Sequence, residues 1–148
     1  MLFRSVSGDL AGAEKRYQEA LVADPDHVPS LNNLAALHTQ QKKPDAVALA
    51  ERAVRRAPEQ PALLDTLAAA YAANNDMPKA IKVQTQAVAL APDEGMLRLA
   101  LARLYLQADS KAQAKYQLEE LARMGQRFAE QGEVAKLLAT LVGTAASQ

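Results

Sequence analysis

The sequence contains no cysteine and no tryptophan, and aromatic residues make up only 4% of its 148 residues. Without cysteine, the chain has no disulfides, no thiolate metal ligands and no cysteine nucleophile. Runs rich in Val, Ile, Thr and aromatics, which would predict strands, are also missing. No stretch is long and apolar enough to span a bilayer, so we expect no membrane insertion.

An excess of charge of either sign is missing as well, because 17 Lys and Arg residues balance 17 Asp and Glu residues. Nucleic-acid binders draw much of their affinity from neutralising phosphates and normally show a basic face. We therefore expect no nucleic-acid partner. A local basic cluster, Arg52, Arg55 and Arg56, is interpreted as a solvated helix face.

About half of the residues are apolar, and Ala and Leu, both strong helix formers, supply much of that content. An internal repeat organises them. Its landmarks are an Ala, a residue four later, another three later, and a Pro five later. The copies are Ala13, Tyr17, Ala20 and Pro25; Ala46, Ala50, Ala53 and Pro58; Ala80, Gln84, Ala87 and Pro92; and Ala114, Leu118 and Leu121 without the Pro. Their first residues lie 33, 34 and 34 positions apart.

A second set of residues precedes each of the last three copies and shares spacings of three, four and seven. The members are Leu31, Leu34, Ala35 and His38; Leu64, Leu67, Ala68 and Tyr71; and Arg98, Leu101, Ala102 and Tyr105. Such spacing puts them on one face of a helix, so each repeat is predicted to be two amphipathic helices joined by a turn. We expect helices near residues 10–23, 29–41, 45–57, 61–74, 78–90, 94–107, 111–124 and 129–142.

These residues resemble the tetratricopeptide repeat (TPR) pattern, W-x2-L-G-x2-Y, then A-x3-F-x2-A, then P. The segment from Pro61 to Pro92 is most similar, although Leu64 replaces the Trp, Ala68 the Gly and Gln84 the aromatic. The resemblance implies an all-α fold, an α-solenoid of about three and a half TPR helix-turn-helix repeats with a C-terminal capping helix. The part from Pro61 onward also loosely resembles bacterial multi-repeat TPR proteins associated with exopolysaccharide export and exosortase-type sorting.

The predicted organisation is a single domain over residues 1–142. Its repeats span about 8–27, 28–60, 61–94 and 95–125, the capping helix spans 129–142, and residues 143–148 are expected to be a disordered tail. Gly8-Asp9 stands where a turn within the first repeat is expected, so that repeat lacks most of its first helix. Helix 10–23 would then expose Leu10, Tyr17 and Leu21, and self-association through this face is one expectation. Cytoplasmic localisation is expected if Met1 is the native start, and a periplasmic or envelope location if the chain is part of a longer exported protein.

In TPR proteins the first helix of each repeat lines a concave face that binds a protein or peptide. Carried over to this sequence, the resemblance assigns the groove to Asn32, Asn33, Ala36, Gln40, Asp65, Thr66, Ala69, Ala73, Met96, Leu99, Arg103 and Gln107. Its centre is rich in Ala, which predicts room for a partner helix or extended segment. Side-chain amides at the ends can donate and accept hydrogen bonds from a peptide backbone.

No catalytic motif is recognisable, and no metal or other cofactor is expected. His27 is expected in a solvated loop and His38 on a packing face as a hydrogen-bonded residue; the sequence has no His-Glu-x-x-His spacing, P-loop or dinucleotide glycine pattern. The sequence leaves two hypotheses: a non-catalytic module that binds a partner in its groove, and a structural segment of a larger scaffold that assembles through its ends.

Overall fold

The computed structural model describes residues 2–146, and the side chains of residues 9–143. Over the described residues the chain is entirely helical between turns. The elements are α1 (Leu2–Ala23), α2 (Val28–Gln40), α3 (Ala46–Arg56), α4 (Pro61–Ala73), α5 (Met77–Leu90), α6 (Gly95–Gln107), α7 (Lys111–Arg123), the short 3-10 helix η1 (Gly125–Arg127) and α8 (Gln131–Ala146). The six helices α2 to α7 begin and end within one residue of the predicted positions.

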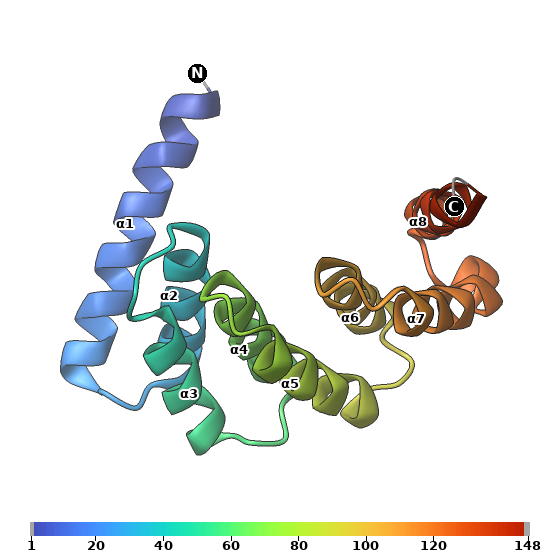
Figure 1. Cartoon of the computed structure of the whole chain (residues 1–148). Helices are drawn as coiled ribbons and strands as arrows, with labels where there is room; N and C mark the ends of the chain where they lie inside the picture. Colours follow the sequence, from blue (N-terminus) through green and yellow to red (C-terminus); the bar gives the residue numbers. More distant parts are fainter. Residues whose placement is uncertain (1, 147–148) are drawn as a thin grey trace.

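Successive helices pack as pairs that follow one another in a row (Figure 1). The pairs are α2 with α3, α4 with α5, and α6 with α7. Figure 1 shows α2 and α4 on the upper side of the row and α3 and α5 below them, with α1 and α8 at the two ends. We call the side formed by α2, α4 and α6 the inner side. The arrangement confirms the predicted all-α solenoid.

The core follows the repeat landmarks. The small residues Ala46, Ala50, Ala53, Ala80, Ala87 and Ala114 are all at most 4% exposed. Leucines from the neighbouring helices fill the space beside them, as Leu31, Leu34, Leu63 and Leu67 do around α3. Because Ala has no side chain beyond Cβ, the helix backbones can approach closely at these crossings. Burial of these apolar surfaces is what holds the pairs together.

The turns within the repeats share one backbone feature. Lys42, Asn75 and Asp109 have φ values of 56°, 62° and 58°, in the left-handed region that reverses the chain after a helix. Asp76 then begins α5 by accepting a hydrogen bond from the Lys79 amide at 3.3 Å. Ser110 occupies the corresponding position before α7, but its side chain makes no capping bond.

The N-terminal helix differs from its prediction. α1 runs without a break from Leu2 to Ala23, where a turn at Gly8-Asp9 was expected. A single glycine costs a helix only about 1 kcal/mol relative to Ala, and no proline interrupts this segment. Tyr17 and Leu21 are half-buried against the cluster around α2 and α3 rather than exposed, whereas Leu10 is 43% exposed as predicted.

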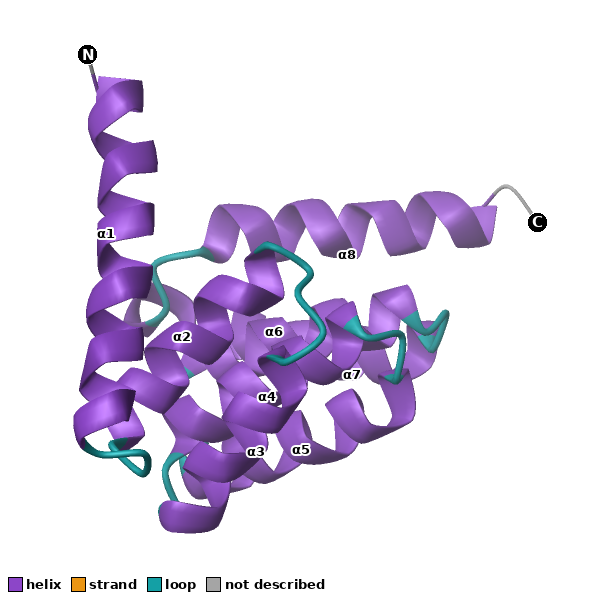
Figure 2. Ribbon diagram, turned by 90° about the vertical axis from the view of Figure 1, so that its left-hand side faces the viewer, coloured by secondary structure: helices purple, strands orange, loops and turns teal. Residues whose placement is uncertain are grey.

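The C-terminal helix covers the last repeat. Figure 2 shows α8 running along the top of the view, above α6 and α7. Its Val134, Leu137 and Leu138, together with Phe128 from the preceding segment, pack against residues of α6 and α7. The expectation of a capping helix is thus met in position. The helix continues to Ala146 instead of giving way to a disordered tail at 143, while residues 147–148 lie outside the described residues.

Candidate interaction surfaces

The inner side presents most of the residues predicted to line a groove. Eight of them have exposed side chains: Asn33, Ala36, Gln40, Ala69, Ala73, Met96, Arg103 and Gln107. The central members are alanines. Ala36 of α2 and Ala69 of α4 occupy the same position of their repeats, so both lie on this side. Amides stand at the two ends of the surface, and Met96 adds an adaptable apolar side chain on α6. Ala73 also lines a cleft of about 150 Å³ with Thr39 and Asn74.

Asn32, Asp65 and Leu99 occupy corresponding positions on α2, α4 and α6, and none of the three is fully exposed. Leu99 is 1% exposed and packs beneath α8 with Phe128 and Val134. Its assignment to the groove is therefore wrong. The reason is that α8 covers this end of α6, as a following repeat would.

Asp65 is half-buried and is held by a residue that the TPR resemblance does not explain. Gln84, 1% exposed, donates from Nε2 to Asp65 Oδ1 at 2.9 Å and to the Leu97 carbonyl at 3.0 Å. Gln84 thus ties α5 to α4 and to α6. The substitution of the usual aromatic residue by Gln84 was visible in the sequence, but its partners were not.

Two further predicted residues are only half-exposed. Thr66 donates its hydroxyl to the Ala62 carbonyl at 3.2 Å, so its side chain is already engaged with its own helix. The Oδ1 atom of Asn32 is buried and accepts no hydrogen bond from any described residue. A buried acceptor without a donor costs free energy, so this oxygen slightly destabilises the fold at this position.

Arg103 is the charged side chain of this surface. It lies 3.4 Å from Glu133 of α8, an ion pair between the last repeat and the capping helix. Glu133 was not among the predicted groove residues, because sequence alone does not place α8 beside α6. The pair is partly exposed, so a ligand carboxylate could compete with Glu133 for the guanidinium.

The two histidines differ in environment. His27 is exposed and its Nδ1 lies 2.7 Å from Ser30 Oγ. His38 is 4% exposed, with Nε2 2.8 Å from Glu14 Oε1 and Nδ1 2.6 Å from Asp45 Oδ1. The prediction of a hydrogen-bonded packing histidine is confirmed. His38 joins α1, α2 and the start of α3.

Glu14 is held by hydrogen bonds from two residues. Lys43 Nζ lies 2.8 Å from Glu14 Oε1 and, with the hydrogen bond from His38, keeps the pKa of this carboxyl below its usual value of 4.5. The ionised form of Glu14 is therefore the form that attaches α1 to the body. Within the described residues, no group of three or more acidic or histidine side chains is arranged to hold a metal ion. No helix among them has the length and apolar character needed to cross a bilayer.

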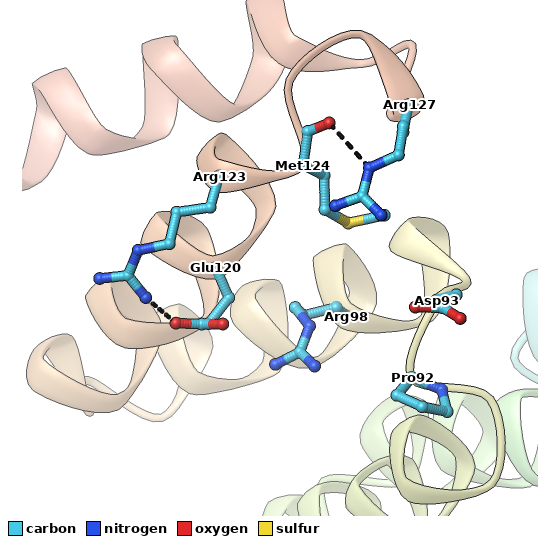
Figure 3. A pocket seen from close by; sticks show the side chains of 7 residues that line it. All are labelled: Pro92, Asp93, Arg98, Glu120, Arg123, Met124 and Arg127. Carbon is cyan, nitrogen blue, oxygen red and sulfur yellow. Dashed lines mark hydrogen bonds and ion pairs between the residues drawn. The ribbon is translucent and has the colours of Figure 1, made fainter.

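The edge of the row that carries the turns between repeats has three clefts at corresponding places. Each is formed by the turn that follows the second helix of one repeat and by the last turns of the second helix of the next. The first, of about 430 Å³, is lined by Asp26, Arg52, Arg55 and Arg56. The second, of about 470 Å³, is lined by Val54, Pro58, Glu59, Leu64, Gln86, Ala89 and Leu90. The third, of about 250 Å³, is lined by Pro92, Asp93, Arg98, Glu120, Arg123, Met124 and Arg127 (Figure 3).

Solved structures with this arrangement of helix pairs are numerous. A crystal structure of MamA matches 97% of this chain and 93% of its own length, with a TM-score of 0.72 and 19% identity. A tetratricopeptide repeat protein from Parabacteroides merdae matches 96% of this chain and 57% of its own, with a TM-score of 0.74 and 18% identity. The fold is that of a tetratricopeptide repeat protein. At these identities the TPR likeness concerns the fold alone.

The same TPR fold also occurs as part of an enzyme. An O-GlcNAc transferase from Thermobaculum terrenum matches 79% of this chain with a TM-score of 0.74 and 22% identity, but only 23% of the transferase is covered. No family model and no curated protein matches the sequence. The likeness therefore shows the fold alone, and a function has to be argued from the surfaces.

Proposed function

We propose that the chain is a non-catalytic module that binds a helix or an extended segment of a partner protein on its inner side. The observation that carries the proposal is the exposed alanine track formed by Ala36, Ala69 and Ala73, with amide side chains at its ends. Small residues leave space for a partner backbone to approach. Asn33, Gln40 and Gln107 can then donate to its carbonyls and accept from its amides.

Two further side chains of the inner side can contribute to binding. Arg103 offers a guanidinium to a partner carboxylate in place of Glu133, and Met96 offers a flexible apolar contact. Leu99 takes no part in the binding, because α8 covers it. Since these contacts hold a partner without reacting with it, the module would act by keeping its partner in place.

The test selects peptides that bind the wild-type chain from a random displayed library and measures their affinity for two matched variants. Ala69→Trp fills the centre of the track, while Ala48→Trp adds the same bulk at an exposed position of α3. We expect Ala69→Trp to abolish binding and Ala48→Trp to leave it unchanged, with both variants melting as cooperatively as the wild type. Selected peptides that bind Ala69→Trp as tightly as the wild type would rule out the inner side as the binding surface.

A second function has one specific observation in its favour. Leu10 is 43% exposed on α1, and Val22 is 85% exposed near the end of that helix; the N-terminal part of α1 extends beyond α2 (Figure 2). Unpaired apolar residues on a terminal helix are typical of a repeat that continues into another subunit. This alternative makes the chain a segment of a larger assembly. Sedimentation equilibrium compares the self-association of the wild type with that of Leu10→Gln. If the chain assembles through α1, this substitution should weaken the association.

A further inference from the structure

We propose that the edge of the row that carries the turns between repeats is a second docking surface, which takes an extended acidic segment of a protein with an apolar side chain near its middle. The surface consists of the three clefts described above, which we call the basic cleft at Arg52–Arg56, the apolar cleft at Leu90 and the second basic cleft at Arg98–Arg127. It shares no residue with the alanine track or with the polar side chains proposed to bind beside it, so this inference is independent of the proposed function.

The three clefts are in register because the repeat puts them there. Asp26, Glu59 and Asp93 each follow the proline that ends a repeat, and Figure 1 shows these connections along the lower edge of the row. The facing positions on the second helices are Arg55, Ala89 and Arg123 in one series and Arg56, Leu90 and Met124 in another. One edge therefore alternates from basic to apolar and back to basic. A ligand that follows the row meets these environments in that order.

The first basic cleft has more positive charge than its own carboxylate neutralises. Arg56 pairs with Asp26, and Arg52 donates to the Pro25 carbonyl while its Nη2 lies 4.0 Å from Asp26 Oδ1. Arg55 is exposed, and no described carboxylate pairs with it. Three guanidinium groups thus face a single acidic side chain. A guanidinium presents parallel N–H donors that match a carboxylate, so this cleft suits an acidic side chain of a ligand.

The second basic cleft repeats the excess on a smaller scale. Arg123 is neutralised by Glu120, but Arg98 donates only to Gln117 Oε1 at 2.7 Å, and the Arg127 Nε donates only to the Met124 carbonyl. Figure 3 shows Arg98 reaching into the space between Glu120 and the Pro92-Asp93 turn. Neither Arg98 nor Arg127 forms an ion pair among the described residues, and with Asp93 and Glu120 in its lining the cleft has three guanidinium groups to two carboxylates.

The middle cleft favours a protein segment over a nucleic acid. Its walls are mostly apolar, with Leu90 45% exposed, and its rim carries Glu59. A phosphate backbone running through this cleft would gain nothing from Leu90 and would be repelled by Glu59. An aliphatic side chain of a peptide would bury Leu90 while the flanking acidic residues meet the arginines. Charge complementarity at both ends thus fixes the occupant as an acidic segment.

The test uses fluorescein-labelled peptides of about 15 residues, long enough to span about 50 Å when extended. Each has acidic clusters at both ends and one Leu near the middle, at a set of spacings, and binding is followed by anisotropy. We expect at least one spacing to bind, with an affinity that falls as salt is raised. A Leu→Ser peptide of the same spacing is expected to bind several-fold more weakly, and Arg55→Glu with Arg127→Glu to weaken binding about tenfold or more.

The controls separate binding at this edge from binding elsewhere on the chain. Arg16→Glu reverses an exposed arginine of α1 outside the clefts and should leave binding unchanged, as should Ala69→Trp on the inner side. The inference is overturned if no spacing binds more tightly than a peptide with its acidic residues scattered, or if the paired Arg variant binds as the wild type does. It is also overturned if a single-stranded DNA of equal charge displaces the peptide and binds more tightly, since the edge would then recognise polyanions without the middle contact.

Discussion

Gln84 reaches from α5 to Asp65 of α4, with its Nε2 2.9 Å from the carboxylate oxygen, while the same nitrogen donates to the Leu97 carbonyl of α6. One buried amide thus joins three helices from two repeats. At this position the repeat pattern usually has an aromatic side chain, which fills space without making such bonds. Here the junction is held by polar contacts, and its stability depends on both acceptors keeping their donor.

Removal of this donor should be costly. Gln84→Ala leaves Asp65 with one hydrogen bond fewer and the Leu97 carbonyl without its side-chain donor, so we expect a loss of about 1–3 kcal/mol in the free energy of unfolding. Urea denaturation followed by circular dichroism measures it. Gln86→Ala, at an exposed position of the same helix, should change the stability by less than about 0.5 kcal/mol. Equal effects of the two changes would show that Gln84 does not hold the junction.

Ala80 tests the close helix crossing. It is 0% exposed and packs with Ala68 and Leu104. Ala80→Leu should overpack this crossing and lower the stability by about 1–3 kcal/mol. The melting temperature measures the loss, and Ala89→Leu on the exposed side of α5 is the control. An unchanged melt for Ala80→Leu would contradict the observed register of the repeat.

Gly95 is fixed by a neighbour in space. A Cβ atom built there would collide with Phe128, since the ring Cε1 would be only 2.8 Å away and Cδ1 nearer still. Gly95→Ala should therefore displace Phe128 and destabilise the C-terminal end by about 1–3 kcal/mol. Gly132→Ala in α8 has no atom within 4 Å of the added Cβ and should leave stability unchanged or raise it by up to about 1 kcal/mol. Chemical denaturation of the two variants checks both signs.

The attachment of α1 should depend on acid pH. The folded-state pKa of Glu14 lies below the ordinary 4.5, because Lys43 and His38 favour its ionised form. Its contribution is therefore fully present above about pH 4.5 and is lost as the pH falls through the lowered pKa. The difference in stability between the wild type and Glu14→Gln should shrink over this range. Glu19→Gln, exposed on the same helix, should show no such convergence. A difference that stays constant down to about pH 2 would exclude this role for Glu14.

The turn residues and the small landmarks made most of the fold predictable. Prolines and short polar segments mark where helices α2 to α7 begin and end, and the Ala positions mark their crossings. His38 could also be anticipated, since it replaces a tyrosine on a packing face. The turn at Gly8-Asp9 was predicted wrongly. These residues are compatible with either a turn or a helix, and the rest of α1 is stabilised by packing.

The surfaces were less predictable than the fold. The position within a repeat correctly identified Asn33, Ala69 and Arg103 as exposed. It also selected Leu99, which is buried because α8 packs over it. Partners such as Gln84 with Asp65 depend on how one repeat is rotated against the next, which the helix pattern does not specify. The lining of the edge clefts could not be predicted for the same reason, because it comes from two neighbouring repeats whose mutual packing the helix pattern does not specify.

Each helix makes its main contacts with helices one or two places away along the chain. A change in stability at α1 should therefore reach α8 through the repeats between them. Such a molecule resembles a short stack of plates more than a globule. Loosening at one end should raise amide exchange there and fade with distance toward the other end. The stack can thus fray at a terminus and still keep its middle pair, α4 and α5, intact.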